Sequence, residues 1–131
     1  MLQIKSTETD ALLEFFDLAG DYFKVSLRSS SHSAVREVYA YTDPEGIASL
    51  FQEAASEWRG WNGTKSWESL EGEFKIELTA DKKGHITINI GINHDCGNPE
   101  PWRLESCIMI EAGQLETIAK RASQFFGSNR P

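Results

Sequence analysis

The sequence predicts an α+β domain in which one antiparallel sheet of about six strands carries two α-helices on one face. Segments that alternate apolar and polar residues occur before residue 42 and again between residues 70 and 111. Each group is followed by a segment with apolar residues at helical spacing. Hairpins combined with two helices that each have one apolar stripe favour a two-layer sandwich, with the helices covering one side of the sheet.

The first group of strands occupies residues 1–41, with strands expected at residues 12–18, 22–27 and 34–41. Ala19-Gly20-Asp21 is a turn signal between the first two. In the second strand, Phe23, Val25 and Leu27 alternate with polar residues, which is typical of a strand with one buried face. A serine-rich polar loop separates the second strand from the third.

The first helix has clear start and stop signals. Asp43 is expected to cap it, Pro44 suits its first position, and Gly60 ends it. Its predicted buried face consists of Ile47, Leu50, Phe51, Ala54, Ala55 and Trp58. Trp58 is therefore expected to be the last buried residue of this helix.

A hairpin follows, with strands on either side of a turn from Asp81 to Gly84. Its expected pairs are Ile76 with Ile88, Leu78 with Ile86 and Phe74 with Ile90, which place every large apolar residue, Leu70 included, on one face. The opposite face is expected to carry Glu71, Glu73, Lys75, Glu77, Thr87 and Asn89.

The C-terminal segment predicts one more strand and one more helix. The strand runs from Trp102 to Glu111, and the helix begins near Ala112-Gly113 and ends at Gly127. The predicted buried face of the helix consists of Leu115, Ile118, Ala119, Ala122 and Phe126.

Length and composition predict a single domain over residues 1–131. The 20 acidic and 13 basic residues give a formal charge of -7, which argues against a nucleic-acid partner and suits a basic protein partner. The N-terminus lacks the features of a signal peptide, and no apolar run is long enough to span a membrane. With two cysteines, the expectation is a cytoplasmic protein with reduced thiols.

Three of the four tryptophans lie in the stretch from Trp58 to Glu73. Trp61 and Trp67, together with Glu71 and Glu73, are predicted to bind a basic partner, since tryptophan is a usual anchor of protein interfaces. The alternative for both tryptophans is that they seal the core beside Trp58, an alternative favoured for Trp67, and Trp61 is expected to be the more exposed of the two. The predicted function is a non-enzymatic interaction module.

A small-ligand binder or an enzyme is the alternative function. Its site would lie between the loop that holds Trp61 and Trp67 and the loop from Asn93 to Pro101, which are expected at the same end of the hairpin. A homodimer through the uncovered sheet face is a third option, but the charges on that face argue against it.

No catalytic residue, cofactor site or metal site is predicted. The cluster His94-Asp95-Cys96 lacks the four ligands at regular spacing that tetrahedral zinc requires. The three histidines do not form a triad by spacing, and glutamates on an open, wet face would not acquire the raised pKa that glycosidase chemistry needs.

One pattern links these segments: Trp58-x-Gly60-Trp61-x-Gly63, Trp67-x-Ser69-Leu70-Glu71-Gly72-Glu73, Asp81-x-x-Gly84-His85, Pro101-Trp102 and Glu111-x-Gly113-Gln114-Leu115-Glu116. It resembles an uncharacterised bacterial family, known only as a domain of unknown function, and the likeness covers about residues 12–127. The resemblance implies a bacterial, single-domain, cytoplasmic protein and supplies no catalytic residues. Small acidic α+β proteins of this kind include immunity proteins that neutralise secreted toxins, so by analogy at the level of the fold an immunity-like inhibitor is one form of the predicted module.

Overall fold

The computed structural model describes residues 1–40, 45–95 and 97–127. The strands are β1 (Leu2–Lys5), β2 (Leu12–Ala19), β3 (Tyr22–Arg28), β4 (Ser33–Tyr39), β5 (Lys65–Glu68), β6 (Phe74–Ala80), β7 (His85–Asn93) and β8 (Arg103–Glu111). The helices are α1 (Gly46–Ser56) and α2 (Leu115–Gly127), and a 3-10 turn, η1 (Ala112–Gln114), leads directly into α2.

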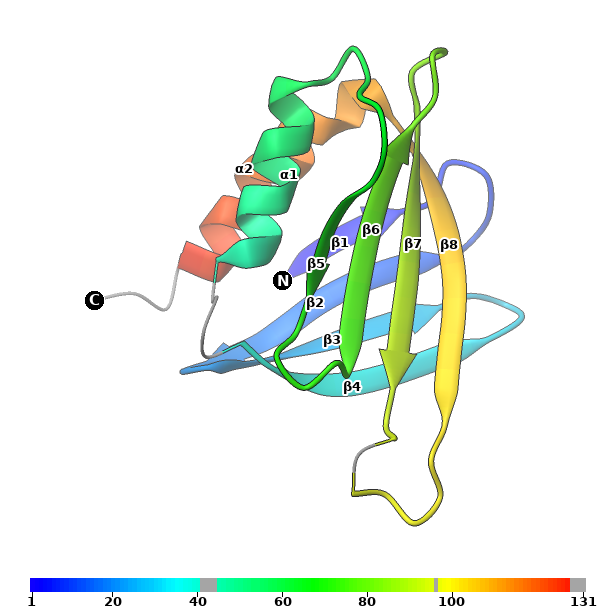
Figure 1. The fold of residues 1–131 in the computed structure, drawn as a ribbon, viewed down its shortest axis with the longest axis vertical. Helices are drawn as coiled ribbons and strands as arrows, with labels where there is room; N and C mark the ends of the chain where they lie inside the picture. The colour runs from blue at the N-terminus through cyan, green and yellow to red at the C-terminus, as the bar shows by residue number, and fades with distance from the viewer. Residues whose placement is uncertain (41–44, 96, 128–131) are drawn as a thin grey trace.

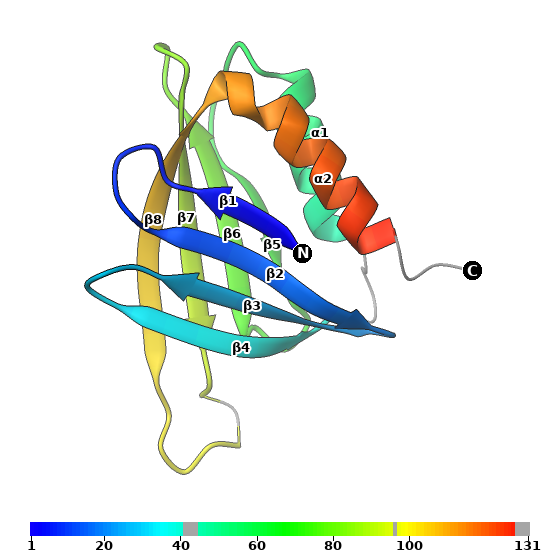
Figure 2. The same cartoon turned by 180° about the vertical axis from the view of Figure 1, so that it is seen from behind.

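The strands form two four-stranded antiparallel sheets, the first in the order β1-β2-β3-β4 and the second in the order β5-β6-β7-β8. The two sheets face each other, and the strands of the first run across those of the second (Figures 1 and 2). The α+β class and the antiparallel pairing are confirmed, but the single sheet of about six strands is wrong. Helix α1 separates two complete meanders, and each sheet covers much of the apolar face of the other.

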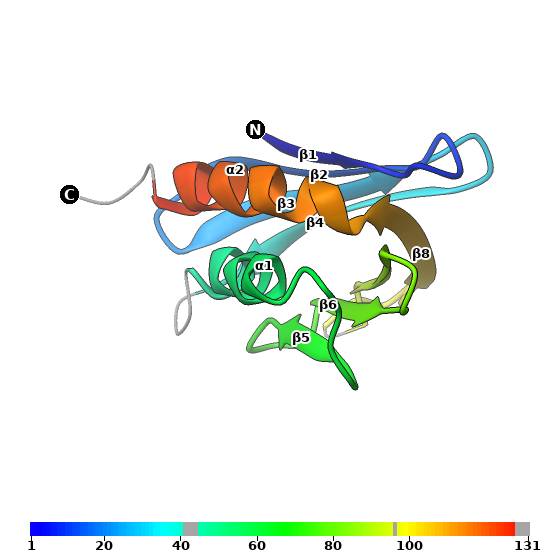
Figure 3. The same ribbon diagram turned by 90° about the horizontal axis from the view of Figure 1, so that it is seen from above.

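The two helices pack against each other and fill one side of the molecule (Figure 3). Helix α1 lies next to β5 and α2 lies next to β1, so each helix adjoins the first strand of a sheet. On the other side, β4 approaches β7. The helices therefore close the space between the two sheets, where the sequence predicted that they would cover one face of a single sheet.

One hydrophobic cluster joins both sheets and both helices. Phe15 of β2 lies in its middle, with its ring centroid 5.8 Å from that of Phe74 on β6 and 5.8 Å from that of Phe126 on α2. It also contacts Phe23 of β3, at 5.9 Å. A residue of the first sheet thus packs directly against the second sheet and the last helix.

Helix α1 is shorter than predicted. Its N-cap is Glu45, while the predicted cap Asp43 and Pro44 lie outside the described residues. The helix ends at Ser56, before Trp58, so Trp58 leaves the helical phase and is 56% exposed. The prediction that Trp58 is buried is wrong, and its ring instead stacks under the guanidinium of Arg59, 5.1 Å from the ring centroid.

The β6–β7 hairpin has the predicted faces but a different register. Ile76 pairs with Ile90 and Leu78 with Ile88, a shift of two residues from the predicted pairs. A shift of two keeps every side chain on its face, so the alternation cannot distinguish the two registers. The turn decides, because the Asp81 carboxylate accepts the backbone N–H groups of Lys83 and His85 and Gly84 adopts a φ of +85°.

The segment before β6 also departs from the prediction. It is a turn, closed by a hydrogen bond from the Gly72 N–H to the Ser69 carbonyl, rather than the start of the strand. Leu70 is therefore 64% exposed and Glu73 is buried, the reverse of their predicted positions. Helix α2, in contrast, has the predicted end and buried face.

Candidate functional site

Trp67 belongs to the core. It lies on β5, is 9% exposed, and its ring centroid is 6.3 Å from those of Phe23 and Phe74. These neighbours come from β3 and β6, so the indole bridges the two sheets. Its burial favours the core role over that of an exposed partner anchor.

Trp61 is half-buried and follows the end of α1 by a few residues. The Lys65 ammonium lies 5.1 Å from its ring centroid and forms ion pairs with Glu53, at 3.0 Å, and with Glu57. The hydrogen bond to Glu57 raises the pKa of Lys65, against a smaller opposing effect of burial. The indole Nε1 is buried and has no hydrogen-bond partner among the described residues.

Glu73 is an interior carboxylate rather than a surface one. It is 4% exposed and accepts a hydrogen bond from the Ser69 hydroxyl and a longer one, at 3.4 Å, from the Tyr39 N–H. The expected outer-face position of Glu73 is wrong, and its contacts tie the turn before β6 to the end of β4. Glu71, in the same turn, is exposed.

The four predicted partner-binding residues do not form one surface. Trp61 lines a small hollow with Asp81 and Lys82, at the end of the molecule that holds the β6–β7 turn. The turn that holds Glu71 lies at the other end of β5, where the Asn93 side chain donates to the Gly72 carbonyl at 2.8 Å. Strand β5, which was not predicted from the sequence, carries the chain from one end of the second sheet to the other. Trp61 precedes this strand and Glu71 follows it, so they lie at opposite ends.

Because β5 runs the length of the second sheet, the two loops of the alternative site are also far apart. Trp61 lies beside the Asp81 turn, whereas His94 and Asp95 follow the opposite end of β7. The expectation that these loops meet at one end of the hairpin is therefore wrong.

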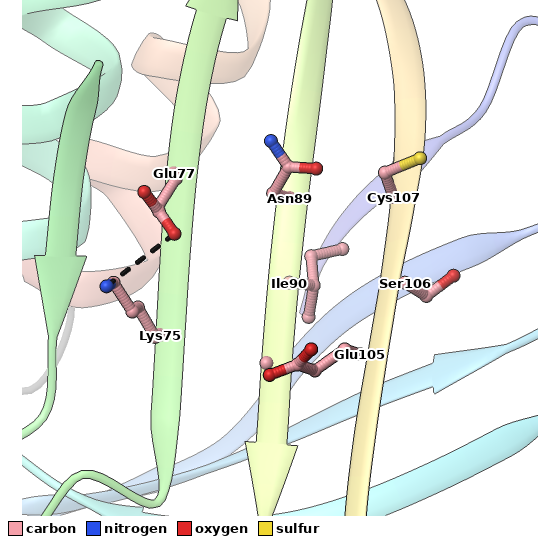
Figure 4. Close-up of a pocket in the computed structure, with 8 residues that line it drawn as sticks. Lys75, Glu77, Asn89, Ile90, Glu105, Ser106 and Cys107 are labelled. Atoms are coloured by element: carbon pink, nitrogen blue, oxygen red, sulfur yellow. Dashed lines mark ion pairs between the residues drawn. The ribbon is translucent and has the colours of Figure 1, made fainter.

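A shallow depression does cross the outer face of the second sheet (Figure 4). It consists of two adjoining hollows of about 420 and 290 Å³, which share Lys75, Gly91 and Glu105. These three residues form one row across β6, β7 and β8. A Cβ atom built on Gly91 would meet no atom within 4 Å, so the missing side chain opens the floor of this depression, called here the outer groove.

The charges around the outer groove are only partly compensated. Lys75 pairs with Glu77 at 3.6 Å, and Arg103 pairs with Asp95 at 2.6 Å. Glu68 on β5 and Glu105 on β8 also line the groove, are exposed, and form no ion pair with a described residue. Neither residue was predicted as part of a site, although Gly91 within an otherwise alternating strand is a signal of an open position on the sheet.

One serine–histidine pair is also present. His32, in the loop between β3 and β4, places Nε2 2.9 Å from the Ser106 hydroxyl and Nδ1 2.8 Å from the Ser31 hydroxyl. Nucleophilic catalysis requires a base that is itself oriented, usually by a carboxylate, but here a second hydroxyl occupies that position. Ser106 pairs with Ile90 and shares the inward phase of β8, so the contact fastens the β3–β4 hairpin to the second sheet.

Comparison with known proteins places the chain in a family but not in a functional class. A family model matches residues 4–129. The chain belongs to DUF6228, a family of unknown function. No curated protein matches it significantly. Within the described ranges, no helix is long and apolar enough to cross a membrane, and no three His, Cys, Asp or Glu side chains gather closely enough to hold a metal ion.

Proposed function

We propose that this protein is a non-enzymatic protein-binding module whose outer groove holds a basic segment of a partner protein. The observation that carries the proposal is a pair of carboxylates outside any described ion pair, Glu68 and Glu105, at the two ends of the row that also holds Lys75 and the open floor at Gly91. Inhibition of a basic toxin by an immunity-like mechanism is one specific form of this function.

The geometry suits an extended segment that lies across the strands. Strands β5 and β8 are three strand spacings apart, about 14 Å, so Glu68 and Glu105 can each contact a different basic side chain of one segment. Glu71 is exposed and directly precedes Gly72, which lines the groove, so it adds a further negative charge to the same turn. The net charge of -7 would also speed the approach of a basic partner.

Gly91 permits a direct test, because its position is open and its φ is not positive. The Gly91→Thr variant fills the groove with a residue that favours strands, and its stability is expected to equal or exceed that of the wild type. Binding is measured by NMR titration of labelled protein with a peptide that alternates arginine and serine. We expect shifts centred on Gly91 and Glu105, and at least tenfold weaker binding by Gly91→Thr.

A matched pair of double variants separates the groove from general electrostatics. Glu68→Gln with Glu105→Gln removes the groove carboxylates, whereas Glu37→Gln with Glu116→Gln removes exposed carboxylates on β4 and α2 and gives the same net charge. The groove pair is expected to lose at least tenfold in affinity and the control pair less than twofold. Equal losses in both, or peptide shifts that map away from Gly91, would refute the proposal.

A further inference from the structure

A second groove lies between β1 and α2. These two elements lie side by side in Figure 2. The groove has a volume of about 450 Å³, and its lining includes Gln3, Lys5, Gln114, Thr117 and Arg121. None of the lining residues is acidic. In a protein with a formal charge of -7, this is a local reversal of sign.

The two cations of this groove are not neutralised. Of the seven lysines and arginines on strands, five form ion pairs with carboxylates, namely Lys24, Arg28, Lys65, Lys75 and Arg103. Lys5 and Arg121 form no ion pair with any described residue, although both line the same groove. An anionic group placed there would meet two charges that the protein does not satisfy by itself.

The backbone of β1 offers a second recognition element. Strand β1 is the edge of the first sheet and pairs only with β2 in the described part of the chain. The Ser6 N–H donates to the Ala11 carbonyl at 3.0 Å. Backbone groups alternate in direction along an antiparallel strand, so the even-numbered residues of β1 direct theirs toward β2. Gln3 and Lys5 are the odd-numbered residues, and their N–H and C=O groups therefore point away from β2.

Thr7 supports this assignment of directions. It is odd-numbered, like Gln3 and Lys5, and its N–H donates to the Met109 carbonyl of β8, at 2.8 Å, rather than to β2. The outward backbone groups at Thr7 are thus used within the protein. Those at Gln3 and Lys5 face the groove, where β1 has no further strand beside it.

We propose that this groove binds an acidic, extended peptide segment, which adds a strand to the free edge of β1. Strand addition uses the backbone groups of Gln3 and Lys5 for affinity, and alternate side chains of the peptide supply specificity. Acidic side chains on one face of the peptide contact Lys5, and those on the other face contact Arg121, whose guanidinium suits a carboxylate. The site differs from the outer groove in location and in sign of charge.

Charge recognition is tested with a fluorescent peptide that repeats the sequence Glu-Glu-Val-Val, which places glutamates on both faces of an extended strand, and with a control peptide that has glutamine in place of glutamate. Fluorescence anisotropy is expected to show binding of the acidic peptide and at least tenfold weaker binding of the control. Lys5→Gln with Arg121→Gln is expected to weaken binding at least tenfold. Lys82→Gln with Lys83→Gln, which changes exposed lysines of the β6–β7 turn, is expected to weaken it less than twofold.

Strand addition is tested at Gln3. Gln3→Pro removes an N–H that faces the groove and leaves the bonds between β1 and β2 in place, while Gln3→Ala removes only the side chain. We expect Gln3→Pro to bind the acidic peptide at least fivefold more weakly than Gln3→Ala does. The proposal would be overturned if Gln3→Pro and Gln3→Ala bound the peptide equally well. It would also be overturned if the groove double variant, at Lys5 and Arg121, bound as well as the control double variant, at Lys82 and Lys83.

Discussion

A single carboxylate organises the turn between β6 and β7. Asp81 accepts the backbone N–H groups of His85 and Lys83, and these bonds, together with the His85 side chain, lower its pKa to about 2. The hydrogen bond to Asp81, at 2.9 Å, is the main cause that raises the pKa of His85 above 6.5, and Glu111 adds to it. The stability of the folded state therefore depends on the protonation of two groups in this turn, the Asp81 carboxyl and the His85 imidazole.

The sign of each titration defines a pH window. The lowered pKa of Asp81 means that its stabilising effect is complete above 3.8 and is lost as the pH falls toward 2. The raised pKa of His85 means that its effect is complete below 6.5 and is lost as the pH rises through the raised value. The turn should contribute most to stability between pH 3.8 and 6.5.

The Asp81→Asn variant checks this coupling. We expect the pKa of His85, measured by NMR titration, to fall toward 6.5 because its main partner loses its charge. Glu111→Gln serves as the control and should lower it less, since that carboxylate lies 3.9 Å from Nε2. An unchanged His85 pKa in Asp81→Asn would show that the hydrogen bond is absent in solution.

Ser69 is the second residue whose chemistry can be tested alone. Its buried hydroxyl donates to Glu73 and accepts the Phe74 N–H at 3.1 Å. Ser69→Ala leaves a buried carboxylate with one partner fewer and is expected to cost about 1–3 kcal/mol in urea unfolding. Ser66→Ala, an exposed serine in the adjacent strand, is the control and should change stability by less than about 0.5 kcal/mol. Similar effects of the two substitutions would contradict the role given to the turn.

At the scale of single elements, the sequence predicted what periodicity determines. The buried faces of α2, β6 and β7 follow directly from spacing, and the structure confirms them. The hairpin register was wrong because alternation fixes parity and not the pairing itself. Strand β5 was missed because its four residues include only one buried side chain, Trp67, which is too short a pattern to show alternation.

The missed strand explains why the predicted partner-binding residues do not share one surface. A loop that holds Trp61 and Trp67, with Glu71 at the start of the next strand, would have kept these three residues together. With β5 in place, Trp67 enters the core and the other two lie at opposite ends of the strand. The outer groove could not be predicted from spacing, since it depends on which residues of β5 and β8 flank Gly91.

Truncation of Trp67 and of Trp58 should have very different effects on the free energy of unfolding. Trp67→Ala removes a side chain that bridges both sheets and is expected to cost about 3–5 kcal/mol of the free energy of unfolding. Trp58→Ala, at an exposed site with only a stacked Arg59, should cost less than about 1 kcal/mol. Urea unfolding of both variants checks this, and a large loss at Trp58 would show that the helix extends further than Ser56.

For the whole molecule, the sequence predicted both helices and six of the eight strands in the correct order, but neither β1, β5 nor the assembly into two sheets. Two meanders that each precede one helix are compatible with a single sheet or with two sheets that face each other. The choice depends on contacts between residues distant in sequence, such as Phe15 with Phe74 and Phe126. No local pattern encodes these contacts, so the prediction of one six-stranded sheet was open to this error.

The shared core predicts that both halves of the chain unfold together. All four tryptophans lie between residues 58 and 102, so tryptophan fluorescence reports on the second half, whereas far-UV circular dichroism reports on both. Phe15→Ala changes only the first half in sequence but opens a cavity against Phe74 and Phe126. We expect it to cost about 3–5 kcal/mol and to shift the midpoints of both signals equally in urea.

Phe16→Ala is the matched control for this experiment. Phe16 is the next residue on β2, is half-buried, and occupies the outer face of the first sheet, so its truncation leaves the shared core intact. Its cost should be clearly smaller than that of Phe15→Ala. If Phe15→Ala lowered the midpoint of circular dichroism but not that of fluorescence, the two sheets would unfold independently, and the single core that joins them would not be the main source of cooperativity.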